Sequence, residues 1–270
     1  MAHEVPWRFI KGLSSKKERE KAGMTVAEGP PSVFSALESG VQVEYLVMSE
    51  SFSNSPGGLS VGRIVESGRK PREVFKVPDA LFERMSDTRT PQGVLCVVPV
   101  PMRFPEGSLR SPWEEPLEVI GVDIQDPGNA GTLIRAASAV GASRVVFAGK
   151  SVDPFSPKCI RSSAGTIFAV PVTTAGQQLD PARFVADLAK AGLSIYKTVP
   201  SGGIFPWEAD FTLPCAIVVG NEAQGLQQEI VDGPGRGISI PMPGGTESLN
   251  VAVASGMVLY EALRQRIGRA

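Results

Sequence analysis

The chain has 270 residues, of which 42% are apolar and 20% charged, and its formal net charge is −1. This composition is typical of globular proteins and excludes a largely disordered chain, while 29 glycines and 23 prolines exclude a long coiled coil. We find no charge-free stretch long enough to cross a membrane. The basic N-terminus lacks the apolar segment of a signal peptide, so we expect a cytoplasmic protein with no membrane partner.

Histidine and cysteine usage limits the possible chemistry. The one histidine is His3, and the three cysteines, Cys96, Cys159 and Cys215, are far apart in the sequence. Without a CxxC pair or further histidines, we expect no metal site and no histidine-dependent catalytic triad. The odd number of cysteines and their apolar or small neighbours predict buried, reduced thiols. Any catalysis then relies on other polar side chains or on a cofactor.

Charge and proline content divide the chain. Residues 1–105 carry 14 basic against 12 acidic residues, whereas residues 106–270 carry 13 against 16. Basic residues cluster within 8–21 and 63–76, a pattern that fits either an RNA phosphate backbone or an ordinary solvated surface. Five prolines lie in residues 99–116, which predicts a linker because proline interrupts helices and strands. We therefore expect domains at residues 1–98 and 117–270.

Secondary-structure patterns differ between the two domains. The first shows alternating short segments, in the order helical pattern 26–38, strand 43–48, loop 51–58, helix 59–66, strand 74–77, helix 78–85 and strand 93–98. These segments predict a small α/β domain. In the second domain, strands are expected at 117–123, 144–148, 193–198, 214–219 and 237–240, and helices at 129–140, 158–164, 181–191 and 249–266. Val- and Ile-rich strands that alternate with helices predict a parallel sheet with helices on both faces.

Two loops follow strands of that sheet at its ligand-binding end. In the first, Asn129 fits either a helix N-cap or a ligand contact. Arg135 lies opposite the apolar stripe of the same helix, where it is either an ordinary surface residue or a functional one. In the second loop, Gly220 and Gly225 flank Glu222, and such glycines allow the close approach of a ligand or simply form a strand-to-helix turn.

A third loop, rich in proline and glycine, leads into the last helix. Ser248 and Asn250 lie at its mouth, where they either cap the helix or face a deep site. The helix is apolar nearly all round from Leu249 to Leu259, so we expect it to be buried on every side, in a core or at a subunit interface.

These three loops, in this order, resemble the three motifs of the SpoU/TrmH family of RNA ribose 2′-O-methyltransferases. The motif residues are Asn129, Gly131 and Arg135 in the first loop, Gly220, Glu222, Gly225 and Leu226 in the second, and Ile240, Pro241, Met242, Ser248, Leu249, Asn250 and Val251 in the third. Residues 27–29 and 86–94 are similar to parts of the family's small N-terminal RNA-binding domain, which is of the ribosomal-protein-L30e type. The resemblance covers nearly the whole chain.

The resemblance implies a catalytic domain of the SPOUT class with a C-terminal trefoil knot, a homodimer, and S-adenosylmethionine as the cofactor. It places six residues at the cofactor: Gly220, Gly225, Leu226, Ile240, Met242 and Leu249. It places five polar residues in the catalytic set: Asn129, Arg135, Glu222, Ser248 and Asn250. Arg135 matches the family's proposed general base, although arginine remains protonated at pH 7. It either loses its proton in a special environment or fixes the neighbouring phosphate.

The implied reaction is 2′-O-methylation of a ribose in structured RNA. The separate N-terminal domain favours 23S rRNA over tRNA as the partner. A tRNA methyltransferase and a catalytically inactive RNA-binding homologue remain alternatives, and a nucleotide-dependent dehydrogenase is disfavoured because the first strand has no glycine fingerprint. The intact polar residues at all five active-site positions disfavour an inactive homologue, which would bind RNA without binding the cofactor.

Overall fold

The computed structural model describes residues 4–100, 111–176, 179–246 and 248–268. Two compact units are present: one contains Met1–Leu109 and Phe155–Ala169, and the other contains Arg110–Pro154 and Val170–Ala270. The expected linker lies partly outside the described residues, at 101–110. A segment from the middle of the chain, Phe155–Ala169, thus belongs to the same unit as the N-terminal residues.

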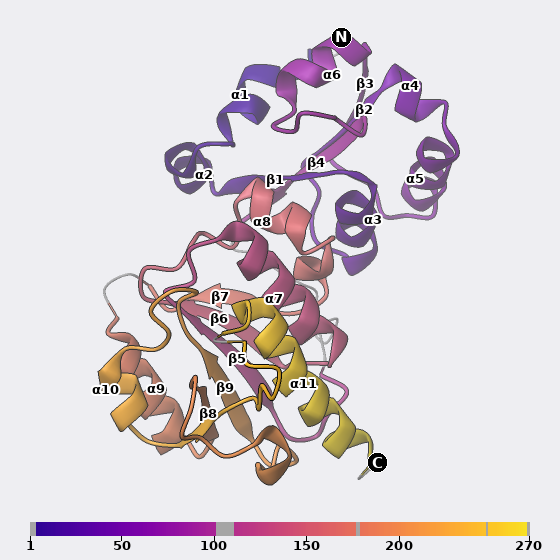
Figure 1. Cartoon of the computed structure of the whole chain (residues 1–270). Helices are drawn as coiled ribbons and strands as arrows, with labels where there is room; N and C mark the ends of the chain where they lie inside the picture. Colours follow the sequence, from indigo (N-terminus) through magenta and orange to yellow (C-terminus); the bar gives the residue numbers. More distant parts are fainter. Residues whose placement is uncertain (1–3, 101–110, 177–178, 247, 269–270) are drawn as a thin grey trace. The chain divides into compact units, whose positions relative to one another are not determined.

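The first unit is built on a four-stranded sheet in the order β1-β4-β2-β3 (Figure 1). Strand β4 is antiparallel to both β1 and β2, and β2 is parallel to β3. The strands are β1 (Met24–Glu28), β2 (Tyr45–Ser49), β3 (Glu73–Val77) and β4 (Val94–Pro99). The helices are α1 (Trp7–Gly12), α2 (Lys16–Ala22), α3 (Pro30–Ser39), α4 (Glu50–Ser53), α5 (Pro56–Glu66), α6 (Asp79–Met85) and α8 (Pro157–Ser162), followed by the 3-10 turn η1 (Thr166–Phe168).

Helices cover both faces of this sheet. Figure 1 shows α1 and α6 on one side and α3 and α5 on the other. The core beneath α1 and α6 includes Ile10, Phe82 and Leu95, each at most 2% exposed. Burial of large apolar side chains of this kind is the main favourable term in folding.

The segment α8–η1 packs against β1 and α3 within the first unit. Thr25 donates a hydrogen bond from its hydroxyl to the Phe155 carbonyl at 2.6 Å, and Ser35 donates one to the Gly165 carbonyl at 2.7 Å. Arg161 approaches the buried Glu28 carboxylate to 3.9 Å. These contacts join residues that are far apart in the sequence, so no local sequence pattern indicates them.

The second unit contains a six-stranded sheet in the order β10-β8-β9-β5-β6-β7, and all of its strand pairs are parallel. Its strands are β5 (Leu117–Val122), β6 (Arg144–Ala148), β7 (Val172–Thr174), β8 (Ser194–Thr198), β9 (Cys215–Val219) and β10 (Arg236–Ile238). The central strands β5 and β9 are completely buried, as a parallel sheet covered on both faces requires. The expected parallel sheet with helices on both faces is confirmed.

The helices of this unit are α7 (Pro127–Ala139), α9 (Pro181–Lys190), α10 (Gln228–Asp232) and α11 (Val251–Ile267), with a 3-10 turn η2 (Pro206–Glu208). In Figure 1, α7 and α11 cover one face of the sheet, and α9 and α10 lie on the other. Helix α11 packs along α7 through Val258, Leu259 and Ala262, which are fully buried. Its opposite side exposes Val253, Met257 and Tyr260, so the helix is not buried on every side within a single chain, and of the two expected alternatives only the subunit interface remains.

Several expected elements need correction. Residues 51–58 were expected to form a loop, but they lie mostly in α4 and α5, because Ser49 and Ser55 cap the two helices with their hydroxyls. Strand β1 occupies part of the helical pattern expected at 26–38, and α3 begins only at Pro30. Helices α1, α2 and α10 and strand β7 were not predicted. All three cysteines are free and buried, as expected, and burial raises the pKa of Cys96 to about 12.

Candidate functional site

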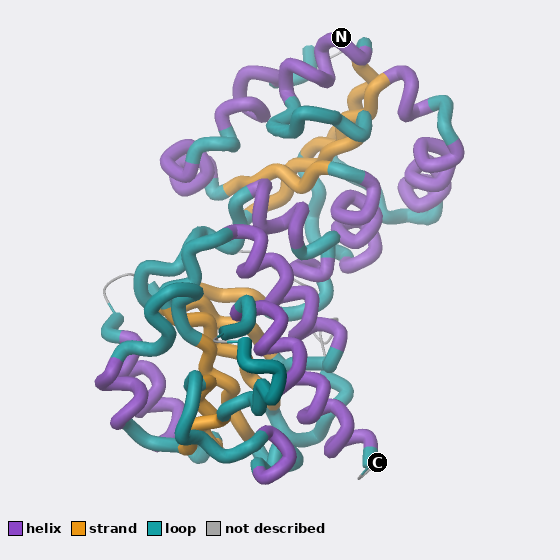
Figure 2. The backbone as a smooth tube through the Cα atoms, in the orientation of Figure 1, coloured by secondary structure: helices purple, strands orange, loops and turns teal. Residues whose placement is uncertain are grey.

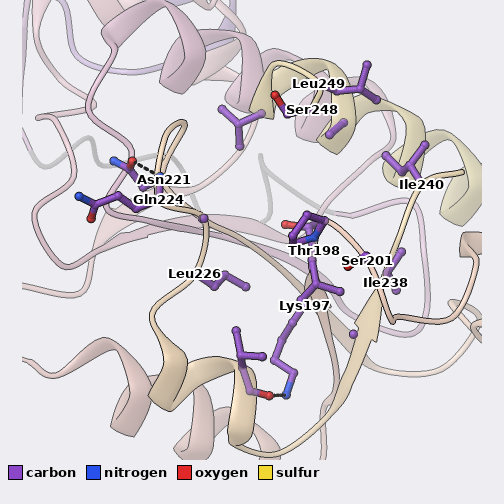
Figure 3. A pocket seen from close by; sticks show the side chains of 18 of the residues that line it. Lys197, Thr198, Ser201, Asn221, Gln224, Leu226, Ile238, Ile240, Ser248 and Leu249 are labelled. Atoms are coloured by element: carbon purple, nitrogen blue, oxygen red, sulfur yellow. Dashed lines mark hydrogen bonds between the residues drawn. The ribbon is translucent and has the colours of Figure 1, made fainter. Parts of the chain in front are cut away.

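A cavity of about 700 Å³ lies at the carboxyl ends of β8, β9 and β10 and is lined by the segments that follow these strands. Figure 2 draws the loops and turns of the chain in teal. Ligands bind at this end of parallel sheets because successive loops converge there. All six residues expected at the cofactor line the cavity: Gly220, Gly225, Leu226, Ile240, Met242 and Leu249. Figure 3 shows Ser248 and Leu249 entering from the segment before α11, and Ile238 and Ile240 from the β10 side.

Gly220 allows the turn after β9 to close on itself. A Cβ atom at this position would lie 2.4 Å from the carbonyl carbon of Gly225, which is backbone and cannot move aside. The turn is held by paired backbone hydrogen bonds between Asn221 and Gly225, at 2.9 and 3.0 Å. A glycine here was expected either to admit a ligand or to form a strand-to-helix turn, and its close neighbour is the chain itself, as in the second alternative. Gly225 has a φ of +69°, a conformation that favours glycine.

Asn221 organises this turn, although the sequence patterns did not single it out. Its side-chain amide donates to the Asp123 carbonyl at 2.9 Å, and its carbonyl oxygen accepts from the backbone N–H groups of Ala223 and Gln224. Asp123 has an unfavourable positive φ of 55° directly after β5. Its carboxylate accepts hydrogen bonds from the Lys150 backbone N–H and the Gln227 side chain. These bonds tie the ends of β5, β6 and β9 together.

Glu222 joins the first and second motif loops. Its carboxylate accepts hydrogen bonds from the Asn129 side chain at 3.0 Å and from the backbone N–H groups of Asp126 and Gln125 at 3.2 and 3.4 Å. Burial by itself would raise the pKa of Glu222, but these hydrogen bonds outweigh burial and lower it. An ionised Glu222 at neutral pH therefore holds the start of α7 against the turn.

Asn250 extends this network to the third motif loop. Its amide donates to the Asn129 carbonyl oxygen at 2.9 Å, and its own carbonyl oxygen caps α11 by accepting from Ala252 and Val253. The capping alternative is thus confirmed for Asn250. It is wrong for Asn129, because Asp126 is the N-cap of α7 and α7 begins at Pro127. Helix α11 likewise begins at Val251 rather than at residue 249.

Lys197 is a buried cation in the cavity wall that we did not predict. The residue is 2% exposed, and its ammonium group donates to the carbonyl groups of Val231 and Gly233, both at 2.8 Å. Burial lowers the pKa of Lys197, and the nearby Asp232 opposes this effect. The two carbonyls belong to the end of α10, so Lys197 holds that end against the floor of the cavity, as Figure 3 shows.

The five residues expected to be catalytic thus differ in how they are placed relative to the cavity. Glu222 and Ser248 line the cavity, and Asn129 and Asn250 connect to it through Glu222. Arg135 is an exposed residue of α7 that forms neither an ion pair nor a hydrogen bond with any other described side chain. The Glu222 carboxylate bonds to the start of α7, and it forms no hydrogen bond or ion pair with Arg135 among the described residues.

The cavity suits a ligand with a flat apolar part and a polar end. Apolar side chains such as Ile240, Leu226 and Leu249 form much of its wall, with a few polar groups at Asn221 and Ser248. Its volume lies within the usual range of small-molecule sites, roughly 300–1,000 Å³. Adenosine attached to a charged amino-acid tail has this distribution of polarity, so the residues fit S-adenosylmethionine. Within the described ranges, no group of His, Cys, Asp and Glu is arranged to hold a metal ion, and no helix has the length and apolar character of a membrane span.

The matched family models cover most of the chain. Residues 116–260 match the SpoU rRNA Methylase family, and residues 8–96 match the MRM3-like substrate binding domain. The first match contains all three motif loops and the whole cavity. Fold, cavity and motifs together define a methyltransferase.

Relatives of similar length are also found. The chain is 32% identical to a 23S rRNA (uridine(2479)-2′-O)-methyltransferase of Streptomyces viridochromogenes, over 97% of this chain and 89% of that protein. It is 31% identical to a 23S rRNA (guanosine(2553)-2′-O)-methyltransferase of Bacillus subtilis, over 93% and 92%. The solved SpoU methyltransferase AviRb from S. viridochromogenes in complex with the cofactor AdoMet matches with a TM-score of 0.78 and 29% identity, over 98% and 100%. The chain therefore belongs to the SpoU rRNA methylase family.

Proposed function

We propose that this protein transfers a methyl group from S-adenosylmethionine to the 2′-hydroxyl of a ribose in structured RNA, most favourably 23S rRNA, in the cytoplasm. The observation that carries the proposal is that the second and third motif loops line one cavity, and that the first motif loop is bonded to both of them through Glu222, Asn129 and Asn250. Nucleotide binding in general does not require hydrogen bonds among these three side chains.

The relatives support rRNA rather than tRNA as the substrate. The two curated 23S rRNA enzymes are similar over at least 93% of this chain. By contrast, the solved TrmH/SpoU tRNA modifying enzyme of A. aeolicus covers 58% of it, with a TM-score of 0.50. The two 23S rRNA enzymes thus also match most of the first unit, which carries the match to a substrate-binding domain. A tRNA substrate is therefore the second candidate.

In this proposal the protein supplies positioning rather than covalent chemistry. When bound, S-adenosylmethionine supplies an activated methyl group on sulfur, whose leaving group is a neutral thioether. The apolar wall at Ile240 and Leu249 excludes water from the cofactor, and Ser248 orients the ribose from the mouth of the cavity. Arg135 is exposed and unpaired among the described side chains, so its guanidinium group is available to bind the phosphate beside the reacting ribose.

The proposal includes a C-terminal trefoil knot. Strand β10 pairs with β8 at the edge of the sheet, and the chain then reaches α11, which packs on α7. The loop after β8 pairs alongside β10, since Ile204 exchanges backbone hydrogen bonds with Gly237 and Ser239. The knot is proposed from the family resemblance, and this pairing places the loop beside the strand that leads toward the last helix.

A homodimer is also part of the proposal. Val253, Met257 and Tyr260 recur at helical spacing on α11 and are 49%, 47% and 67% exposed. An apolar stripe of this kind is covered most simply by the same stripe of a second copy. The domain of residues 1–98 is proposed to recruit the RNA, together with the segment α8–η1 that packs on it.

The proposed function is tested by incubating the purified protein with labelled S-adenosylmethionine and either 23S rRNA or total tRNA. We expect label in 23S rRNA. Mass spectrometry of RNA from wild-type and deletion strains should show a single 2′-O-methylated nucleotide that is present in the wild type and missing from the deletion strain. Label confined to tRNA would show that the substrate is tRNA and not 23S rRNA. Calorimetry with S-adenosylmethionine tests the inactive alternative, which predicts RNA binding without cofactor binding.

A further inference from the structure

Two arginines of the first unit are held against one tryptophan. The guanidinium carbon of Arg84, on α6, lies 4.3 Å from the centroid of the Trp7 ring, and that of Arg8 lies 5.0 Å from it. Such cation–π contacts restrict side chains that are otherwise flexible. Trp7 itself is half-buried and packs against the core beneath α1 and α6. The two guanidinium groups therefore lie against a ring whose position is fixed.

The charge of these two arginines is not neutralised within the part of the chain that the structure describes. Both are exposed, and neither forms an ion pair or a hydrogen bond with a described residue. Other members of the basic clusters already form hydrogen bonds or ion pairs within the protein. Arg19 is buried and donates to the carbonyls of Leu13 and Ser14, and Arg72 pairs with Glu44 at 2.7 Å. Free, pre-organised guanidinium groups are what an RNA phosphate needs.

Helix α1 also exposes an aromatic ring, Phe9, on a different side from Trp7 because the two residues are two positions apart. Phe9 is 40% exposed, although a phenylalanine gains most from burial. Its edge contact with Tyr45, with ring centroids 6.4 Å apart at 87°, fixes its orientation, and Tyr45 in turn contacts Phe75 at 5.9 Å. A fixed, exposed ring is a platform on which an unpaired base can stack at low entropic cost.

We propose that Trp7, Arg8, Phe9 and Arg84, named here the Trp7 surface, bind an unpaired segment of the RNA substrate that crosses α1. The guanidinium groups contact the phosphates, and the Phe9 ring stacks on a base. Charge complementarity selects the partner, because the surface combines uncompensated positive charge with an aromatic face. The inference rests on the proposed function, since it names how the first unit holds the RNA.

The test uses the full-length protein and fluorescence anisotropy with a labelled single-stranded RNA of about 20 nucleotides and its duplex form. For Arg8→Ala/Arg84→Ala we expect single-strand affinity to fall by about tenfold or more, with a shallower salt dependence because two phosphate contacts are lost. For Phe9→Ala we expect a fall of roughly tenfold for the single strand and little change for the duplex, with the salt dependence unchanged.

The matched control is Arg63→Ala/Arg69→Ala, which removes the same charge from exposed positions of the same unit. We expect its affinity to change by less than about threefold. Equal losses in both double variants, or unchanged binding by Phe9→Ala, would overturn the proposal. Thermal unfolding shows whether each variant is folded.

Methyl transfer and cofactor calorimetry separate this proposal from the proposed function. If the wild type methylates RNA and the Trp7-surface variants bind RNA and turn over normally, the surface assignment is wrong and the function stands. If the wild type methylates no RNA but its RNA binding depends on these residues, the surface stands and the function is wrong.

Discussion

The side-chain amide of Asn129 donates a hydrogen bond to Glu222 at 3.0 Å, although 93 residues separate them. The direction of this bond is determined by its neighbours. Asn250 must turn its carbonyl oxygen to the N–H groups that begin α11, so its amide faces the Asn129 oxygen. Asn129 is then left with its own amide toward the Glu222 carboxylate, which only accepts. The three motif loops are therefore connected by a hydrogen-bond chain with one polarity.

Replacing Asn129 with aspartate should break this chain. Asn129→Asp places a second carboxylate against Glu222 and removes the donor, so the start of α7 moves away from the turn. Because small displacements of positioning groups cost about 100-fold in rate, we expect methyl transfer to fall by at least about that factor. Thr132→Ala is the control, since the exposed Thr132 hydroxyl bonds only to the Gly128 carbonyl of its own helix. Activity of Asn129→Asp within about twofold of wild type would contradict a positioning role.

Glu222→Gln should change how stability depends on pH. The pKa of Glu222 lies below its ordinary value of 4.5, because hydrogen bonds to the ionised form outweigh the opposing effect of burial. Its stabilising contribution is therefore present above about pH 4.5 and is lost as the pH falls through the lowered pKa. Glu222 is exposed, so we expect at most about 1 kcal/mol at pH 7. Urea unfolding of both proteins should show a difference at pH 7 that disappears in acid, and a constant difference would refute this account.

Gly220→Ala should damage the cofactor site. The added Cβ atom would overlap the backbone of Gly225, so the turn must open, at a cost of about 1–3 kcal/mol in the free energy of unfolding. We expect affinity for S-adenosylmethionine to fall by more than about tenfold by calorimetry. Gly62→Ala in α5 is the control, because its Cβ would meet no atom within 4 Å and a helical alanine is favourable. Unchanged cofactor affinity in folded Gly220→Ala would place the site elsewhere.

Arg135→Ala should abolish methyl transfer without affecting the fold. The side chain is exposed and lies away from the buried stripe of α7, so we expect stability to change by less than about 0.5 kcal/mol and cofactor affinity to be unchanged. Arg135→Lys should also be inactive, because a point charge cannot replace a planar guanidinium fork. Single-turnover assays with RNA measure the loss. Near-normal turnover by either variant would rule out an essential role for Arg135.

Met257→Lys should convert the proposed homodimer into a monomer. Met257 lies at the middle of the exposed stripe on α11, and a buried unpaired lysine at an interface is strongly unfavourable. Light scattering coupled to size-exclusion chromatography measures the mass. Leu59→Lys provides the control, since Leu59 is 60% exposed on a helix of the first unit. A Met257→Lys protein that remains dimeric would show that the interface lies elsewhere.

The role of the first unit is better tested by point substitutions than by truncation. Deleting residues 1–98 would uncover α8 and η1, whose Ile160, Ile167 and Phe168 are fully buried within that unit. Newly exposed apolar residues promote aggregation. A truncated chain would therefore lose RNA binding and solubility together, whereas the Trp7-surface variants change only exposed side chains and one ring.

From the sequence we predicted the parallel sheet apart from β7, the three motif loops and six residues that line the cavity. The spacing of apolar residues indicates local secondary structure, and glycines and prolines indicate where strands end. Helix caps were harder to predict, because Asp126 and Asn129 are both good capping residues and only the backbone conformation shows which one caps α7.

Only the tertiary structure decided which distant groups meet. Asn129 contacts Glu222 and Asn250 across 93 and 121 residues, Arg84 reaches Trp7 from another helix, and Phe155–Ala169 joins the N-terminal unit. Such contacts depend on the path of the whole chain through both sheets. A hydrogen bond or ring contact acts over a few ångströms of space, whereas a sequence pattern records only separation along the chain.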